Sequence, residues 1–400
     1  MSSECHKILV FTEDFPPDVG GIAQWAFGLS QAWHELGHAV GVMTRWRPRY
    51  RPDDLPETPY PTFWMRGPRW QQLRTWHCYR HLRRYLRAGN RPEWVLATTW
   101  NFARGIRGLS RRYGFRLITA VHGLDVTRKM SRAKQRWLRR TLEDSACVVA
   151  VSRFTRQQVI DRYGIPAEKV IAMPPGVDVQ RFRPGLDAAS LKQKFGIGDR
   201  KVILTLARIV ERKGHDLVVR ALPEVRRQMP DVLYLIAGPA DRDYLPRLKR
   251  LIQESGVEDA VRFLGYVPAG DLPLLYNLAD VYAMPSRELR EAGDTEGFGI
   301  TYLEANACGT PVIGGRSGGV GDAIADGETG FLVDPENPRE LAEKLVALLS
   351  NRNLREKLGR QGRRRVEQNF TWKRIAERLL AQLEENCSLR KPPDESGNGN

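Results

Sequence analysis

The chain has 400 residues, of which 42% are hydrophobic and 28% are charged, so it has the composition of a globular protein and is long enough for two domains. No apolar run approaches the eighteen residues of a membrane span, no apolar signal segment follows Met1, and the five cysteines are scattered without a C-x-x-C pair, which argues against a membrane-spanning protein, a disulfide framework and a zinc site. The net charge of +16 lies entirely in residues 1–185, which carry 31 Lys and Arg against 15 Asp and Glu, so this half is expected to meet an anionic partner.

The opening of the chain predicts a βαβ unit. Residues 7–11 indicate a buried strand, residues 25–36 follow a helical pattern, and residues 38–43 indicate a second strand. Such an opening predicts a parallel, doubly wound α/β sheet that binds ligands at the carboxyl ends of its strands. Gly20 and Gly21 follow the first strand and are therefore candidate ligand-binding residues, although an ordinary tight turn would also explain the pair.

Residues 45–91 form the most basic segment, with twelve arginines and only three acidic residues among several Trp and Tyr side chains. A nucleic-acid surface and a patch on anionic lipid headgroups are both compatible with this composition. Residues 70–86 could form an amphipathic helix with arginines on one side, although a loop or a solvated helix would also fit. Residues 131–140 repeat the combination of basic residues with tryptophan.

Further strands are predicted at residues 94–98, 116–121 and 147–152. The second of these ends at His122, a position where the ligands of a parallel sheet bind, so His122 is a functional candidate even though a lone histidine is often structural. Asp125 lies close by and could instead cap the next helix. We place the end of the first domain near Pro184, after a Pro-rich linker.

The second domain opens with a strand at residues 201–207, followed by a loop that contains Arg208 and Lys213. Two fixed cations there could balance the charge that develops on a departing nucleoside diphosphate without a metal. Two surface cations would usually mean nothing, and their place between strand and helix is the reason for the assignment. Asp241-Arg242-Asp243 has the form of a metal-binding D-x-D sequence, but it lies in a charged loop, and we interpret it as surface.

The stretch 287–319 carries the strongest signal. Gly297-Phe298-Gly299 predicts a tight turn, a helix starts at Ile300 and ends at Gly309, and residues 311–313 indicate a buried strand. The free N–H groups of Phe298, Gly299 and Ile300 at the start of this helix would favour a phosphate.

Two carboxylates frame that turn, Glu296 in the loop and Glu304 in the helix. Since an acid beside a phosphate would repel it, we expect both to contact uncharged groups, such as sugar and ribose hydroxyls. A solvated helix face would explain one such pair, but the surrounding glycines favour the functional interpretation.

These stretches resemble the retaining glycosyltransferases of family 4, which have the GT-B fold, and the resemblance runs in order from about Lys7 to Trp372. It implies two Rossmann-like domains that face a cleft, and a last helix that crosses back to the first domain. The expected domains are residues 1–184 for the acceptor, 185–368 for the nucleotide sugar, a crossover helix at 369–386 and a disordered tail at 387–400.

The same resemblance assigns roles to single residues. Gly20 and Gly21 line the cleft, His122 contacts the sugar, Glu296 binds the sugar hydroxyls and Glu304 the ribose, while Arg208 and Lys213 hold the phosphates. The loop at Tyr266 and Val267 resembles the place where the family holds the base. Glu296, His122, Arg208 and Lys213 are the implied catalytic residues.

The resemblance implies a retaining transfer with neither a metal nor another cofactor. The loop before Ile300 is similar to that of bacterial phosphatidylinositol mannosyltransferases, which favours GDP-mannose as the donor and leaves UDP-glucose and UDP-N-acetylglucosamine open. The expected acceptor is a lipid-linked or cell-envelope glycan. We therefore favour an anionic membrane surface over nucleic acid as the partner of the basic half, with a cytoplasmic location that includes the inner face of the plasma membrane.

Three other classes of protein are alternatives to this interpretation. A GT-B epimerase would convert a UDP-sugar without any acceptor. A dinucleotide oxidoreductase would need G-x-G-x-x-G after the first strand, and Gly20-Gly21 lacks that spacing. A nucleic-acid or membrane binder without activity would leave Glu296, Arg208 and Lys213 without a use.

Overall fold

The computed structural model describes residues 5–67 and 71–388 and divides into two compact units. The first unit combines Met1–Gly176 with Trp372–Asn400, and the second is Val177–Thr371. The predicted boundary at Pro184 lies within the second unit, where Phe182 is buried and its carbonyl accepts a hydrogen bond from Arg363 Nη1 at 2.6 Å. Of the predicted tail, residues 389–400 lie outside the described residues.

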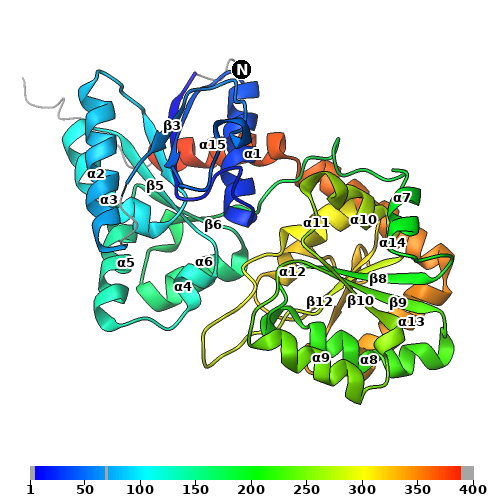
Figure 1. Cartoon of the computed structure of the whole chain (residues 1–400). Coiled ribbons are helices and arrows are strands. Elements are labelled where there is room, and N and C mark those ends of the chain that lie inside the picture. The colour runs from blue at the N-terminus through cyan, green and yellow to red at the C-terminus, as the bar shows by residue number, and fades with distance from the viewer. Residues whose placement is uncertain (1–4, 68–70, 389–400) are drawn as a thin grey trace, which may run out of the picture. The chain divides into compact units, whose positions relative to one another are not determined.

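The first unit is built on a seven-stranded parallel sheet in the order β3-β2-β1-β4-β5-β6-β7 (Figure 1). Its strands are β1 (Lys7–Thr12), β2 (Ala39–Arg45), β3 (Thr62–Met65), β4 (Trp94–Ala97), β5 (Arg116–Val121), β6 (Cys147–Ala150) and β7 (Val170–Ala172). Its helices are α1 (Gly21–Glu35), α2 (Gln71–Arg87), α3 (Trp100–Tyr113), α4 (Leu124–Thr127), α5 (Arg132–Asp144), α6 (Arg153–Tyr163) and α15 (Trp372–Ser388).

The side chains of β1 are buried alternately on the two faces of this sheet, because successive residues of a strand point to opposite sides. Ile8 and Val10 pack in one core with α1 and α15, whereas Leu9 and Phe11 pack in another with α2 and α3. Figure 1 shows these helix pairs on opposite sides of the sheet. The helix α15 thus completes the core of the first unit, although it follows the whole second unit in the chain.

The second unit repeats this architecture around a six-stranded parallel sheet in the order β10-β9-β8-β11-β12-β13. The strands are β8 (Lys201–Leu206), β9 (Val232–Ala237), β10 (Val261–Gly265), β11 (Val281–Met284), β12 (Val312–Gly315) and β13 (Gly330–Val333). The helices are α7 (Ala189–Lys194), α8 (His215–Gln228), α9 (Tyr244–Glu254), α10 (Leu272–Leu278), α11 (Ile300–Ala307), α12 (Val320–Ala323), α13 (Pro338–Ser350) and α14 (Arg352–Asn369).

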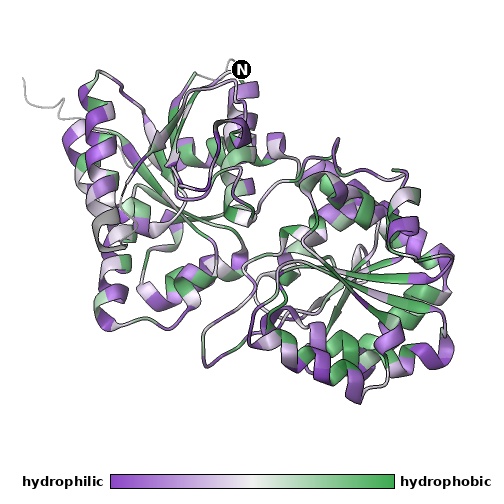
Figure 2. Cartoon of the chain, in the orientation of Figure 1, coloured by the Kyte–Doolittle hydropathy of each residue, from purple (hydrophilic) through white to green (hydrophobic). Residues whose placement is uncertain are grey.

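Hydropathy follows these layers, with hydrophobic colour along the strands and mixed colour on the covering helices (Figure 2). The predicted doubly wound α/β class is confirmed for both units. The prediction missed β3. The predicted amphipathic helix in the basic segment is α2, and the expected helix at Ile300 is α11.

Candidate active site

The turn before α11 has the geometry of an anion site. Gly299 has a φ of 91°, a conformation that favours glycine, and a Cβ atom there would lie 2.5 Å from the ring of Tyr302. No described side chain caps this helix, so its first N–H groups remain available to a ligand. Phe298, Gly299 and Ile300 therefore lie at the start of α11, where the sequence predicted that their N–H groups bind a phosphate.

Glu296 lies just before this turn and is bound by two cations. Its Oε2 atom lies 2.5 Å from Lys213 Nζ and 2.7 Å from Arg212 Nη1, with Ser286 Oγ at 3.5 Å. Burial by itself would raise the pKa of Glu296, but the charges of Lys213 and Arg212 outweigh it and lower the pKa to about 2. The carboxylate is therefore ionised at neutral pH.

The expectation that both carboxylates contact uncharged groups is wrong for Glu296. Glu304 lies in α11, and its Oε2 accepts a hydrogen bond from the Tyr276 hydroxyl at 2.7 Å. Glu296 instead contacts charged groups because both Lys213 and Arg212 approach its Oε2. Of these two cations, only Lys213 was predicted from the sequence. Burial of a carboxylate is costly unless cations or hydrogen-bond donors offset it, and at Glu296 two cations do so.

The short helical turn after β8 supplies the cations. Glu211–Lys213 forms this turn, and Gly214 follows with a φ of 73° against the carbonyl of Pro285. Burial lowers the pKa of Lys213, while Glu296 acts against that shift. Arg208 is exposed, and no residue in the described part of the chain pairs with its guanidinium. Lys213 and Glu296 therefore form an ion pair, while Arg208 lies on the surface of the second unit.

The other predicted residues of the second unit are placed less specifically. The side chain of Tyr266 is 67% exposed, and Val267 follows it beyond the end of β10. Asp241 uses its carboxylate on the backbone N–H groups of Asp243 and Tyr244, both at 3.0 Å. This capping of α9 agrees with the interpretation of the D-x-D sequence as surface.

In the first unit, Gly20 and Gly21 start α1, and a Cβ atom at either position would meet no atom within 4 Å. His122 lies beside the same helix, with its ring edge-on to Trp25 at 5.4 Å between centroids. The first unit thus gathers the predicted glycines and the predicted histidine around α1.

The ring of His122 has a defined tautomer. Its Nε2 donates to the carbonyl oxygen of Thr98 at 2.8 Å, and its backbone N–H donates to Asp125 Oδ1 at the same distance. Burial lowers the pKa of His122 to about 4, although the hydrogen bond to the Thr98 carbonyl acts in the opposite direction. Burial also raises the pKa of Asp125 to about 6. At neutral pH the imidazole is therefore uncharged, and Nδ1 carries the lone pair.

Part of the basic segment is used within the first unit. Arg47 Nε donates to Asp18 Oδ2 at 2.7 Å, and the same guanidinium pairs with Asp14. Arg49 also pairs with Asp18, and Arg45 Nη1 lies 3.3 Å from Glu13 Oε1. These arginines therefore hold the loop that leads to Gly20, so this part of the basic segment is paired within the first unit.

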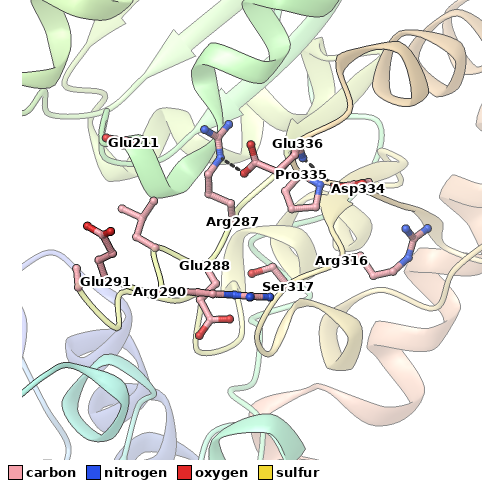
Figure 3. A pocket seen from close by; sticks show the side chains of 12 residues that line it. Glu211, Arg287, Glu288, Arg290, Glu291, Arg316, Ser317, Asp334, Pro335 and Glu336 are labelled. Atoms are coloured by element: carbon pink, nitrogen blue, oxygen red, sulfur yellow. Dashed lines mark hydrogen bonds and ion pairs between the residues drawn. The ribbon is translucent and has the colours of Figure 1, made fainter.

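A cavity of about 730 Å³ lies beside the loop that leads to Glu296 (Figure 3). It is lined by Glu211, residues 287–292, Arg316, Ser317 and residues 334–336. Arg287 donates to both carboxylate oxygens of Asp216 at 2.9 and 3.0 Å, and its Nε lies 3.6 Å from Glu336 Oε1. The charged loop at residues 287–292 therefore forms part of the cavity lining. Neither Lys213 nor the first residues of α11 line this cavity.

Comparison with known proteins adds family information to this geometry. Residues 19–181 match the model described as Glycosyltransferase Family 4, and residues 187–365 match the model of Glycosyl transferases group 1. A GDP-mannose-dependent alpha-(1-6)-phosphatidylinositol monomannoside mannosyltransferase of Mycolicibacterium smegmatis is 40% identical over 69% of this chain and 72% of its own. A GDP-mannose-dependent monoacylated alpha-(1-6)-phosphatidylinositol monomannoside mannosyltransferase of Corynebacterium glutamicum is 30% identical over 94% of this chain and 97% of its own.

Solved structures show the same fold at lower identity. Sucrose-phosphate synthase of Thermosynechococcus elongatus has a TM-score of 0.79 at 23% identity, covering 96% of this chain and 100% of its own. The HepE protein of Anabaena in complex with UDP and glucose has a TM-score of 0.77 at 20% identity, covering 95% and 100%.

Proposed function

Since this chain belongs to the family 4 glycosyltransferases of the GT-B fold, we propose that it transfers a mannosyl residue from GDP-mannose to a lipid-linked or cell-envelope glycan, with retention at the anomeric carbon. The observation that carries the proposal is the buried set of Lys213 and Glu296 beside the uncapped start of α11. The printed specificities of the mannosyltransferase relatives support the donor and the class of acceptor.

In this proposal the donor diphosphate binds the N–H groups at Phe298, Gly299 and Ile300, together with Arg208 and Lys213. These cations and the helix start would stabilise the charge that develops on the leaving diphosphate. Oε1 of Glu296 and the carboxylate of Glu304 would accept hydrogen bonds from hydroxyl groups. Glu296 would bind those of the sugar, and Glu304 those of the ribose.

The chemical step is an exchange of one bond for another on the same face of the sugar. The bond from the anomeric carbon to the diphosphate oxygen breaks, and a bond to the acceptor hydroxyl oxygen forms. The proton of that hydroxyl passes to the departing diphosphate. His122, which is uncharged and has a lone pair on Nδ1, would accept a hydrogen bond from a sugar hydroxyl without adding charge to the site.

We further propose that an anionic membrane surface binds the first unit through α2, α3 and α5. Trp76 on α2 is 57% exposed with Arg80 over its ring, and Trp137 on α5 is 42% exposed with the Arg104 guanidinium carbon 3.7 Å from its ring centroid. Exposed aromatic rings beside arginines suit the headgroup region of a bilayer. Within the described ranges, no helix combines the length and apolar content that crossing a bilayer requires.

The donor is tested by offering GDP-mannose, UDP-glucose and UDP-N-acetylglucosamine in turn, with a membrane extract as acceptor and mass spectrometry of the products. A hexose added to a glycolipid from GDP-mannose alone supports the proposal. Transfer only from a UDP-sugar would refute the donor. Conversion of a UDP-sugar without an acceptor would instead identify an epimerase. Sedimentation with phosphatidylglycerol vesicles, compared with phosphatidylcholine vesicles, tests the membrane surface.

A further inference from the structure

Arg212 is the most deeply buried cation beside the candidate site, and it has two anionic partners. Its side chain is 6% exposed, and its Nη1 donates to Glu296 Oε2 at 2.7 Å. Its Nε lies 2.7 Å from Asp294 Oδ1, close enough for an ion pair although the two atoms are not aligned as a hydrogen bond. One planar guanidinium therefore contacts two carboxylates of the loop, those of Asp294 and Glu296.

The backbone around these carboxylates is held at both ends. Leu289 and Asp294 pair across a short hairpin, with the Leu289 N–H donating to the Asp294 carbonyl at 2.8 Å. At the near end, the Arg287 N–H donates to the carbonyl of Arg212 at 2.9 Å. At the far end, the carbonyl of Glu296 accepts a hydrogen bond from the Gly319 N–H at 2.8 Å. The main chain and the side chain of Arg212 thus both bind this loop.

The contacts to Glu296 are asymmetric. Lys213, Arg212 and Ser286 all approach Oε2, whereas no residue of the described chain forms a hydrogen bond or an ion pair with Oε1. A carboxylate held by one oxygen presents the other in a fixed direction. If Lys213 serves a diphosphate, Arg212 is the cation that continues to hold Oε2.

We propose that Arg212 is a positioning residue for the transfer, which holds Glu296 by Oε2 so that Oε1 meets the donor sugar while Lys213 serves the diphosphate. The inference rests on the proposed function of Glu296 and Lys213. It adds a residue that neither binds the donor nor reacts, and whose effect is exerted through Glu296 and Asp294.

The charges around Glu296 agree with this role. Two cations, Arg212 and Lys213, face two anions, Asp294 and Glu296, so the charges of this set are balanced. Tyr302, the nearby tyrosine of α11, is uncharged at neutral pH because burial raises its pKa. Of the cations that lower the pKa of Glu296, Lys213 has the larger effect and Arg212 the second. Loss of Arg212 would therefore raise the pKa of Glu296.

The experiment compares Arg212→Ala, Arg212→Lys and Asp294→Asn with the unchanged full chain, by steady-state kinetics from pH 4 to pH 9 with GDP-mannose. For Arg212→Ala we expect kcat to fall about 10- to 100-fold, because a small misplacement of a positioned group has an effect of this size. The donor KM should change much less, and the acidic limb of kcat, which Glu296 places below pH 4 in the unchanged chain, should rise into the measured range. Arg212→Lys should keep the acidic limb but not the full kcat, since an ammonium cannot contact both carboxylates.

Arg226→Ala is the matched control, because this arginine of the second unit forms a two-pronged pair with Asp259 at 2.8 and 2.6 Å, outside the site. Its kinetics should match the unchanged chain. Wild-type kcat and acidic limb in Arg212→Ala would overturn the inference. If that variant does not fold, wild-type kcat in both Arg212→Lys and Asp294→Asn would overturn it instead.

Glu296→Ala separates this inference from the function on which it rests. If Glu296→Ala retains full transfer, the proposed role of Glu296 fails whatever the Arg212 variants do. If Glu296→Ala is inactive and the Arg212 variants behave as the unchanged chain, only the positioning role fails.

Discussion

Lys213 Nζ lies 2.5 Å from Glu296 Oε2, so the cation assigned to the donor diphosphate is paired with the carboxylate assigned to the donor sugar. The pair is buried, with side chains 13% and 11% exposed. A diphosphate that draws Lys213 away would change the surroundings of Glu296 at the same time. Phosphate binding and sugar orientation are therefore coupled at one pair of side chains.

The first prediction separates the two roles of this pair. Lys213→Ala should lower transfer about 10²- to 10³-fold, as loss of one charge-stabilising donor does, and should weaken GDP binding in calorimetry. Glu296→Gln should also lower transfer but should weaken GDP binding less than Lys213→Ala does, because the proposed function assigns this carboxylate to the sugar and Lys213 to the diphosphate. Lys249→Ala, an exposed lysine of α9, is the control. Equal loss of GDP affinity in both site variants would contradict the assignment.

The second prediction concerns the turn at Gly299. Gly299→Ala should destabilise the protein by about 1–3 kcal/mol, because alanine disfavours a φ of 91° and its Cβ atom would lie against the ring of Tyr302. Chemical denaturation measures this change. Gly270→Ala is the control, since a Cβ atom there would meet no atom within 4 Å. Equal stability of the two variants would show that the turn is not strained.

The third prediction concerns the contact between His6 and α15. His6 Nδ1 lies 2.8 Å from Glu93 Oε2 and its Nε2 lies 2.7 Å from Glu384 Oε1, an arrangement that suits a doubly protonated imidazole. Burial lowers the pKa of His6, but the two carboxylates outweigh it and raise the pKa above 6.5. His38 stacks on the same ring, and Arg116 lies 3.5 Å from Glu93.

Because the pKa of His6 is raised on folding, its stabilising contribution is complete below pH 6.5 and is lost as the pH rises through the pKa of the folded protein. Glu384→Gln should therefore lower the free energy of unfolding more at pH 6 than at pH 9, and should speed hydrogen exchange in α15. Glu385→Gln, next to it on the helix, should do neither. A difference independent of pH would rule out the role of His6.

The fourth prediction concerns His122, whose pKa is lowered on folding, whereas that of His6 is raised. The effect of pH on stability is therefore opposite at the two histidines. The pKa of His122 is lowered to about 4 in the folded protein, so the unfolded chain binds a proton at this residue between pH 6.5 and about pH 4, and the folded protein does not. The unchanged chain should thus lose stability as the pH falls through this range, relative to His122→Gln. Urea denaturation at pH 7 and pH 5 measures the difference. Above pH 6.5 the two proteins should show no pH-dependent difference.

The fifth prediction concerns the loop that leads to Gly20. Arg47→Ala should destabilise the first unit by about 1–3 kcal/mol, because the side chain of Asp18 is 6% exposed and would keep Arg49 as its remaining cationic partner. Limited proteolysis should then cut within residues 13–20. Arg51→Ala, in the same loop as Arg47 but exposed, is the control. Unchanged stability and unchanged cleavage in Arg47→Ala would show that the ion pairs do not hold the loop.

Local sequence determined the elements that carry the site. The glycines at 297 and 299, the start of α11 at Ile300 and the strand after Gly309 were all predicted, because turn chemistry and helix boundaries depend on residues that are neighbours in the chain. The doubly wound sheets followed from the alternation of apolar strands with helices.

Tertiary structure alone decided which charges are paired. Arg212 and Asp294 are 82 residues apart, and Arg47 and Asp18 are 29 apart, so no local pattern distinguishes these arginines from exposed ones. The state of His122 likewise depends on burial and on the carbonyl of Thr98 from a neighbouring strand. Burial and long-range partners set the cost of a charge, and both exist only after the chain has folded.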